Sequence, residues 1–133
     1  MTRSKLIYVA VIFIMSFLFC QKDLVADQLE DAYKKQYERY TTEIENLQKS
    51  IKSDEDSLEK AESFYNNYCI ANPLEHIGAH LYKECDGVLT SRKVFTERLE
   101  TDRPKLMEVE AKKQELKIKI LETKGTLPNW WTK

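Results

Sequence analysis

Glycine and proline are scarce in this sequence, with three of each among 133 residues. Both residues interrupt helices and mark turns, so their scarcity leaves little room for a fold built from short strands and tight turns. Charged residues make up 32% of the chain, and Glu, Lys and Leu are frequent. This composition favours long helices and predicts an all-α fold in one domain.

Motifs that mark common catalytic sites are also missing. The sequence contains neither a G-x-S-x-G nucleophile turn nor a glycine-rich phosphate-binding loop. No Asn-x-Ser/Thr sequence occurs, so conventional N-glycosylation is not expected. The formal net charge of −1 gives no indication of nucleic-acid binding. We therefore predict a protein that is not an enzyme, has no cofactor and does not bind nucleic acid.

Histidine is rare as well, and the two that occur are the candidates for a metal site. His76 and His80 lie four residues apart, with Glu84 four residues further on. On a helix all three would share one face, which is a spacing that metal ligands use. Gly78 lies between the histidines and no fourth ligand is evident. We therefore expect polar loop residues here and no metal site.

The N-terminus has the pattern of an export signal. Arg3 and Lys5 precede the uncharged run Leu6–Phe19. Fourteen helical residues span about 21 Å, less than the roughly 30 Å of a bilayer's hydrocarbon core. A cleaved signal peptide over residues 1–26 is therefore favoured over a permanent anchor.

The cleavage site itself departs from the preferred pattern. Ala26 suits the position before the cut, but Leu24 is larger than the residue preferred two positions earlier. An uncleaved membrane anchor through residues 6–20 is therefore the alternative. Lipidation of Cys20 is disfavoured, because Phe19 stands where lipoprotein signals need a small residue. By either favoured route the rest of the chain leaves the cytosol, for the periplasm or the extracellular medium.

Cys69 and Cys85 remain once residues 1–26 are removed. An even number of cysteines in a small exported domain indicates a disulfide. A bond between two cysteines 16 residues apart would stabilise the fold by about 3 kcal/mol in the chain-entropy model. Two free thiols or an intermolecular bond are the alternatives.

Two segments, 27–69 and 85–124, carry apolar residues at alternating steps of three and four. Ten of eleven such positions are apolar or aromatic in the first arm, and eight of eleven are apolar in the second. This spacing is typical of the seam of a coiled coil. The seam positions are Tyr33, Tyr37, Tyr40, Ile44, Leu47, Ile51, Asp54, Leu58, Ala61, Tyr65 and Tyr68, then Cys85, Val88, Arg92, Phe95, Leu99, Asp102, Leu106, Val109, Lys113, Leu116 and Ile120.

The steps run in opposite order in the two arms, so the seams match when the arms are antiparallel. We predict an antiparallel two-helix coiled-coil hairpin over residues 27–124, with a tip loop at 70–84 closed by the disulfide. Tyr68 would then lie opposite Cys85. The first arm has a net charge of −5 and the second of +2, which favours their association. Pairing with a second copy of the chain is the alternative.

Two residues affect where the second helix ends and whether it is continuous. Gly125 directly follows Lys124 and is expected to end the helix. Pro104 lies inside the arm, where it would kink or divide the helix, with Thr101 or Asp102 capping the later piece.

The C-terminal tail, residues 125–133, contains Trp130 and Trp131. Indoles are costly to expose, so we expect contacts with the base of the hairpin, a protein partner or a membrane interface. Adjacent side chains point in different directions. A lid over Tyr33 and Ile120 would therefore bury one indole and leave the other available for a partner.

The plan of a short apolar N-terminus, heptad arms and paired cysteines is similar to that of phage inner-membrane spanins and of small periplasmic coiled-coil chaperones. The similarity is one of architecture and implies no activity. The sequence thus predicts a non-enzymatic exported or envelope protein that acts as a structural or adaptor module. Its expected partner is another protein or a second copy of the chain. A membrane-tethered phage lysis protein and a periplasmic holdase-like chaperone are the alternatives.

Overall fold

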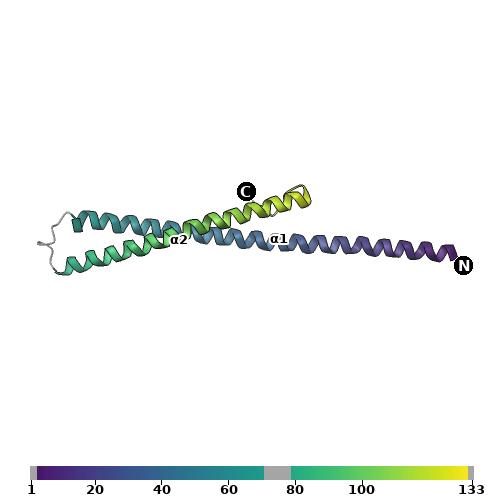
Figure 1. Cartoon of the computed structure of the whole chain (residues 1–133), viewed down its shortest axis with the longest axis horizontal. Coiled ribbons are helices and arrows are strands. Elements are labelled where there is room, and N and C mark those ends of the chain that lie inside the picture. The colour runs from purple at the N-terminus through teal and green to yellow at the C-terminus, as the bar shows by residue number, and fades with distance from the viewer. Residues whose placement is uncertain (1–2, 71–78, 132–133) are drawn as a thin grey trace. The chain divides into compact units, whose positions relative to one another are not determined.

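Two long helices make up most of the chain (Figure 1). The computed structural model describes the backbone of residues 3–70 and 79–131, and the side chains from Val25 to Ile70 and from Lys83 to Trp131. The elements in chain order are helix α1 at Arg3–Phe64, the π-helical turn η1 at Tyr65–Ile70 and helix α2 at Ala79–Lys124. No strand occurs in these two ranges, so the predicted all-α fold is confirmed.

Both helices begin earlier in the chain than the predicted arms do. Helix α1 begins at Arg3, so the helix already runs through residues assigned to the export segment. Helix α2 begins at Ala79 instead of Cys85, which makes the predicted tip loop too long. Residues 79–84 contain neither Gly nor Pro. Extending an existing helix through such residues costs far less than nucleating a new one.

Pro104 does not divide α2, which continues through it to Lys124. A proline has no N–H for the carbonyl four residues earlier, here that of Glu100. Glu100 is exposed, so water can reach that carbonyl. The hydroxyl of Thr101 donates to the carbonyl of Glu97 at 3.0 Å, as in a helix interior. The expected capping role of Thr101 is therefore wrong.

Gly125 ends α2 as the sequence predicts. Its φ of 75° lies in the left-handed region, where a glycine carries no steric penalty. Its N–H donates to the carbonyl of Leu121 at 2.8 Å, which satisfies one of the last free carbonyls of the helix.

The chain divides into two compact units. The first comprises residues up to 39 together with those from 116 onward, and the second comprises residues 40–115. In the second unit, α1 and α2 form a helical hairpin joined by a disulfide between Cys69 and Cys85. In the first unit, the end of α2 and the tail pack on the earlier part of α1.

The buried face of each helix is the predicted seam. Nine described residues are buried, and all nine occupy predicted seam positions. Tyr37, Leu116 and Ile120 lie in the first unit, and Leu47, Ile51, Asp54, Cys85, Leu99 and Val109 lie in the second. The alternating spacing therefore identified correctly which side of each helix faces the other.

Contacts between the helices of the second unit establish that they are antiparallel. As residue numbers rise along α1, the numbers of their partners fall along α2. The pairs are Glu43 with Lys105 at 3.3 Å, Ser50 with Asp102 at 3.1 Å, Asp54 with Arg98 at 3.5 Å, Glu62 with Arg92 at 3.7 Å, and Cys69 with Cys85. These contacts agree with the predicted register, which sets Asp54 opposite Leu99.

Tyr68 departs from the predicted seam. It is 52% exposed instead of lying opposite Cys85, and its ring packs 5.0 Å from that of Phe64. The cause is η1, because a π-helical turn holds more residues than an α-helical turn and rotates the following side chains away from the seam. Cys69 faces Cys85 instead and bonds to it.

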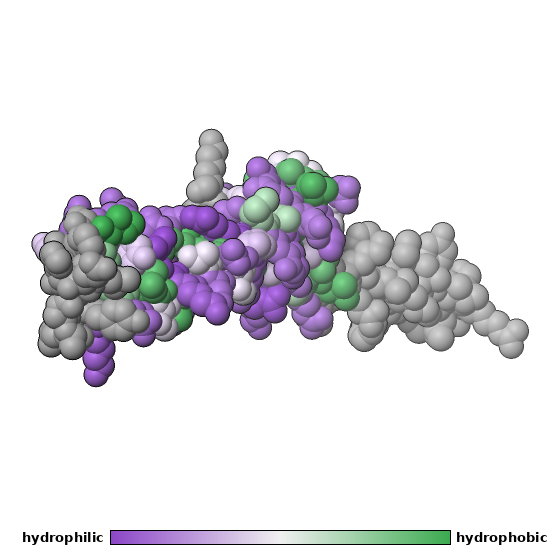
Figure 2. All heavy atoms as spheres, turned by 60° about the vertical axis from the view of Figure 1, so that its left-hand side comes forward, coloured by the Kyte–Doolittle hydropathy of each residue, from purple (hydrophilic) through white to green (hydrophobic). Residues whose placement is uncertain are grey.

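Polar residues dominate the surface outside the seam. In the face drawn in Figure 2, hydrophilic residues cover most of the coloured surface, and hydrophobic residues form small separate patches. Exposed apolar side chains of the second unit include Leu89, Val94 and Met107, none of which belongs to the seam. Burial along one stripe of each helix is therefore the main source of stability.

We expect Leu47→Asp to destabilise the hairpin by several kcal/mol, because it buries an unpaired carboxylate where Leu47 is 8% exposed. Circular dichroism should show a large loss of helicity or of melting temperature. Leu89→Asp is the matched control, because Leu89 is 43% exposed in the same unit and should tolerate the same change. Equal losses from the two substitutions would contradict the assigned seam.

Candidate functional site

The tail folds back on α1 after Gly125. Lys124 and Trp130 both contact Glu30, whereas Trp131 contacts Tyr37, seven residues further along α1. The N–H of Trp131 donates to the carbonyl of Pro128 at 3.0 Å, so the residues between them form a tight turn. This turn brings two adjacent indoles to the same part of the helix.

Three rings form a cluster that we call the aromatic clasp: Tyr37, Trp130 and Trp131. The ring centroid of Tyr37 lies 5.5 Å from that of Trp130 and 4.6 Å from that of Trp131. The rings are tilted by 54° and 44°, which is within the range that aromatic pairs prefer. Tyr37 is buried and both indoles are half-buried, so the clasp covers α1 while part of each indole stays exposed.

Glu30 connects the tail to the end of α2. The indole Nε1 of Trp130 donates to Oε1 of Glu30 at 3.3 Å, and Nζ of Lys124 donates to Oε2. The hydrogen bond from Lys124, followed by that from Trp130, lowers the pKa of the Glu30 carboxyl below its ordinary value. The ionised carboxylate therefore holds both groups against α1.

The predicted lid over Tyr33 and Ile120 is replaced by the clasp on Tyr37. Ile120 is already fully buried in the seam, at 0% exposure. The argument that two adjacent indoles cannot share one packing site is wrong, because the turn from Pro128 to Trp131 redirects the backbone between them. The dipeptide Pro128-Asn129 is a turn signal from which this bend could have been inferred.

Cys69 and Cys85 form the predicted disulfide, with 5.9 Å between their Cα atoms. The bond joins η1 to α2, and Cys85 is buried. The guanidinium of Arg92 lies over the ring of Tyr65, 5.3 Å from its centroid. These contacts hold the last turn before the connection against α2.

The remaining predicted sites fall largely outside the described residues. His76 lies in the undescribed segment 71–78, and the side chain of His80 is not described either. In the part of the chain that the structure describes, no cluster of three or more His, Cys, Asp or Glu side chains could hold a metal ion. The histidine spacing is therefore not tested.

The side chains of the apolar run Leu6–Phe19 also lie outside the described part. Among the residues that were described, no helix is both long enough and apolar enough to cross a membrane. Comparisons of the chain with protein-family models, curated proteins and solved structures found no match. The site must therefore be interpreted from its own geometry, which is that of a contact surface of aromatic rings.

Acid should open the clasp through Glu30. The pKa of the Glu30 carboxyl in the folded protein is below its ordinary value of 4.5. The ionised carboxylate therefore stabilises the clasp fully above pH 4.5, and this stabilisation is lost as the pH falls through the folded-state pKa. The chain's two tryptophans both lie in the clasp, so their fluorescence should shift to longer wavelengths over this acid range.

Glu30→Gln should remove this transition and leave the indoles more exposed at neutral pH. Glu38→Gln is the control, because Glu38 is an exposed carboxylate in the same unit. An unchanged acid transition in Glu30→Gln would show that another group opens the clasp.

Proposed function

We propose that this chain is a non-enzymatic protein exported to the periplasm or the extracellular medium, where a coiled-coil hairpin serves as a structural or adaptor module. The observation that carries the proposal is the disulfide between Cys69 and Cys85. Such bonds persist in oxidising compartments and are rare in the cytosol. They are also a usual supplement in small domains whose core is thin.

The N-terminal sequence supports the same compartment independently. A basic start followed by the apolar run Leu6–Phe19 is the pattern of an export signal. Nothing in the disulfide depends on that pattern, so two separate features favour export. The mostly hydrophilic face drawn in Figure 2 suits a module that works in water and presents only selected residues to partners.

The compartment can be tested by fractionating the native host and measuring intact masses with and without reductant. We expect protein outside the cytosol with one Cys69–Cys85 bond, and a mass that lacks residues 1–26. Full-length protein in the membrane fraction would favour the anchored alternative, a tethered phage lysis protein. Full-length, fully reduced protein in the cytosol would overturn the proposal.

For the indoles of the clasp we propose a protein partner and not a lipid surface. Glu30 and Tyr37 follow Phe19 by about 17 and 27 Å along a continuous helix. The headgroup layer is roughly 5–8 Å thick on each side of the hydrocarbon core. In an upright, uncleaved anchor with the apolar run centred in the bilayer, the clasp would therefore lie beyond the headgroups. Half-buried Trp side chains in such a position are suited to contacts with another protein.

Reconstitution of the full-length chain into vesicles with brominated acyl chains tests this choice. We expect little quenching of Trp130 and Trp131, because neither indole reaches the acyl chains. The control carries Val25→Trp with Trp130→Phe and Trp131→Phe. Residue 25 follows Phe19 by only about 9 Å, so its indole should be quenched more. Strong quenching of the native pair would favour the membrane interface.

A holdase-like chaperone is the second candidate, and a specific observation favours it. Tyr68 is 52% exposed and Ile70 is 64% exposed, and they flank the disulfide at Cys69. A chaperone of this kind needs apolar side chains at the tip of its hairpin. Two exposed apolar side chains form only a small surface for holding unfolded chains, so the adaptor role remains the first proposal.

A further inference from the structure

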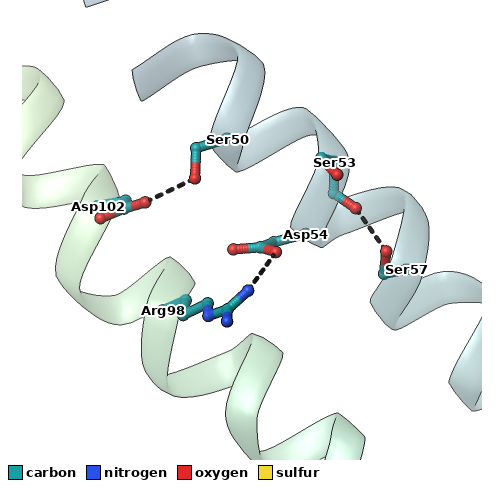
Figure 3. A network of polar contacts seen from close by, with 6 residues as sticks. All are labelled: Ser50, Ser53, Asp54, Ser57, Arg98 and Asp102. Carbon is teal, nitrogen blue, oxygen red and sulfur yellow. Dashed lines mark hydrogen bonds and ion pairs between the residues drawn. The ribbon is translucent and has the colours of Figure 1, made fainter. Parts of the chain in front are cut away.

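Among the described residues of the second unit, a single carboxylate is buried in the seam. Asp54 is 5% exposed, although its neighbours along the seam of α1 are apolar. Its Oδ1 atom lies 3.5 Å from Nη1 of Arg98 on α2. Figure 3 shows the two side chains pointing toward each other between the helices. Its Oδ2 atom is buried and has no hydrogen-bond partner among the described residues. The carboxylate is thus only partly compensated.

Further polar contacts surround this pair. The hydroxyl of Ser50 donates to Oδ2 of Asp102 at 3.1 Å, one turn along α1 from Asp54 (Figure 3). Nη2 of Arg103 donates to Oε1 of Glu55 at 2.7 Å. Each contact joins α1 to α2, so the polar group in the seam belongs to the interface between the helices.

A buried ion pair of this kind seldom adds stability. Removing two charges from water costs several kcal/mol, which their attraction repays only when the geometry and the remaining hydrogen bonds are good. Here one carboxylate oxygen has no hydrogen-bond partner in the described part of the chain, and the other is at the long end of hydrogen-bond distance. Leucine at position 54 would stabilise the seam more, so the presence of Asp54 needs a different reason.

The competing state for α1 is pairing with α1 of a second copy, because its seam is the more apolar of the two. In a parallel pair in register, Asp54 would meet its own copy, with Glu55 of each chain beside it. In an antiparallel pair, Asp54 would lie opposite a seam residue that is followed by a step of three, as it lies opposite Leu99, and it would need a cation just before that residue. The seam residues of this kind in α1 have no Lys or Arg before them, because the preceding residues are Gln36, Glu43, Ser50, Ser57 and Phe64.

Helix α2 differs from α1 at these positions. The residues just before the seam positions Leu99, Leu106, Lys113 and Ile120 are Arg98, Lys105, Lys112 and Lys119. Helix α2 therefore supplies a cation to Asp54, whereas a second copy of α1 supplies none in either the parallel or the antiparallel orientation. We infer that Asp54, paired with Arg98, selects α2 over a second copy of α1 as the partner helix. The residue acts by destabilising self-association more than it destabilises the hairpin.

The disulfide disfavours a different competing assembly, the dimer that exchanges α2 between two copies of the chain. A dimer that exchanges α2 between two copies would keep every contact of Asp54, so the carboxylate cannot discriminate against it. The bond between Cys69 and Cys85 ties the two helices of one chain together. Reduction therefore exposes the hairpin to exchange, whereas substitution of Asp54 exposes it to pairing between copies of α1.

Analytical ultracentrifugation of the full-length chain in mild detergent, under reducing conditions, tests the inference. We expect Asp54→Leu and Asp54→Asn to form dimers with a dissociation constant lowered at least about ten-fold relative to wild type. Asp54→Asn removes only the charge and keeps the shape. Asp56→Leu is the matched control, because Asp56 is exposed two residues away and should associate like wild type.

Lysine crosslinking in a mixture of isotope-labelled and unlabelled chains reports which helices pair between copies, because both α1 and α2 contain lysines. In the Asp54→Leu dimers, crosslinks between labelled and unlabelled copies should join α1 to α1 through Lys49, Lys52 or Lys60. In wild type, such crosslinks should be rare. The inference is overturned if Asp54→Leu stays as monomeric as wild type, if Asp56→Leu dimerises equally, or if the crosslinks between copies join only α1 to α2.

Discussion

Burial of one apolar stripe on each helix is the interaction on which the rest of this structure depends. All nine buried described residues lie on the two predicted stripes, and hydrophilic residues dominate the face drawn in Figure 2. Two helices that bury one stripe each have a thin core, so a single charge or misplaced residue affects a large share of the total stability. That constraint explains why the chain adds contacts at defined points of the stripe.

Each added contact addresses a different weakness of a two-helix fold. In the second unit, the Cys69–Cys85 bond holds η1 to α2 where the regular α-helix ends. In the first unit, the aromatic clasp covers Tyr37 with two indoles where α2 has already ended. The bond is covalent and limits the unfolded chain, whereas the clasp depends on ring packing and on the ionised Glu30. The two units therefore differ in the conditions that would open them, reductant for one and acid for the other.

Polar residues in the seam have a different effect from the apolar ones. Leu47, Leu99 and Val109 stabilise any arrangement in which they are buried, whether the partner helix comes from the same chain or another. Asp54 is compatible with few partners, because a buried carboxylate needs a cation at one position. An apolar stripe thus supplies the free energy of association, and a charge within it restricts which helices can associate.

The sequence by itself determined the two helices, the buried side of each, the antiparallel register, the glycine that ends α2 and the bonded pair of cysteines. These features follow from residue spacing and cysteine number, which are properties of the chain alone. Tertiary structure decided the exposure of Tyr68, the counter-charge of Asp54 and the site on which both indoles pack. Each of these depends on a local change of direction, at η1 or at the Pro128 turn, or on a side chain reaching across between helices. A repeating pattern describes regular helices, so it cannot specify where the backbone departs from them or which long side chain crosses the gap.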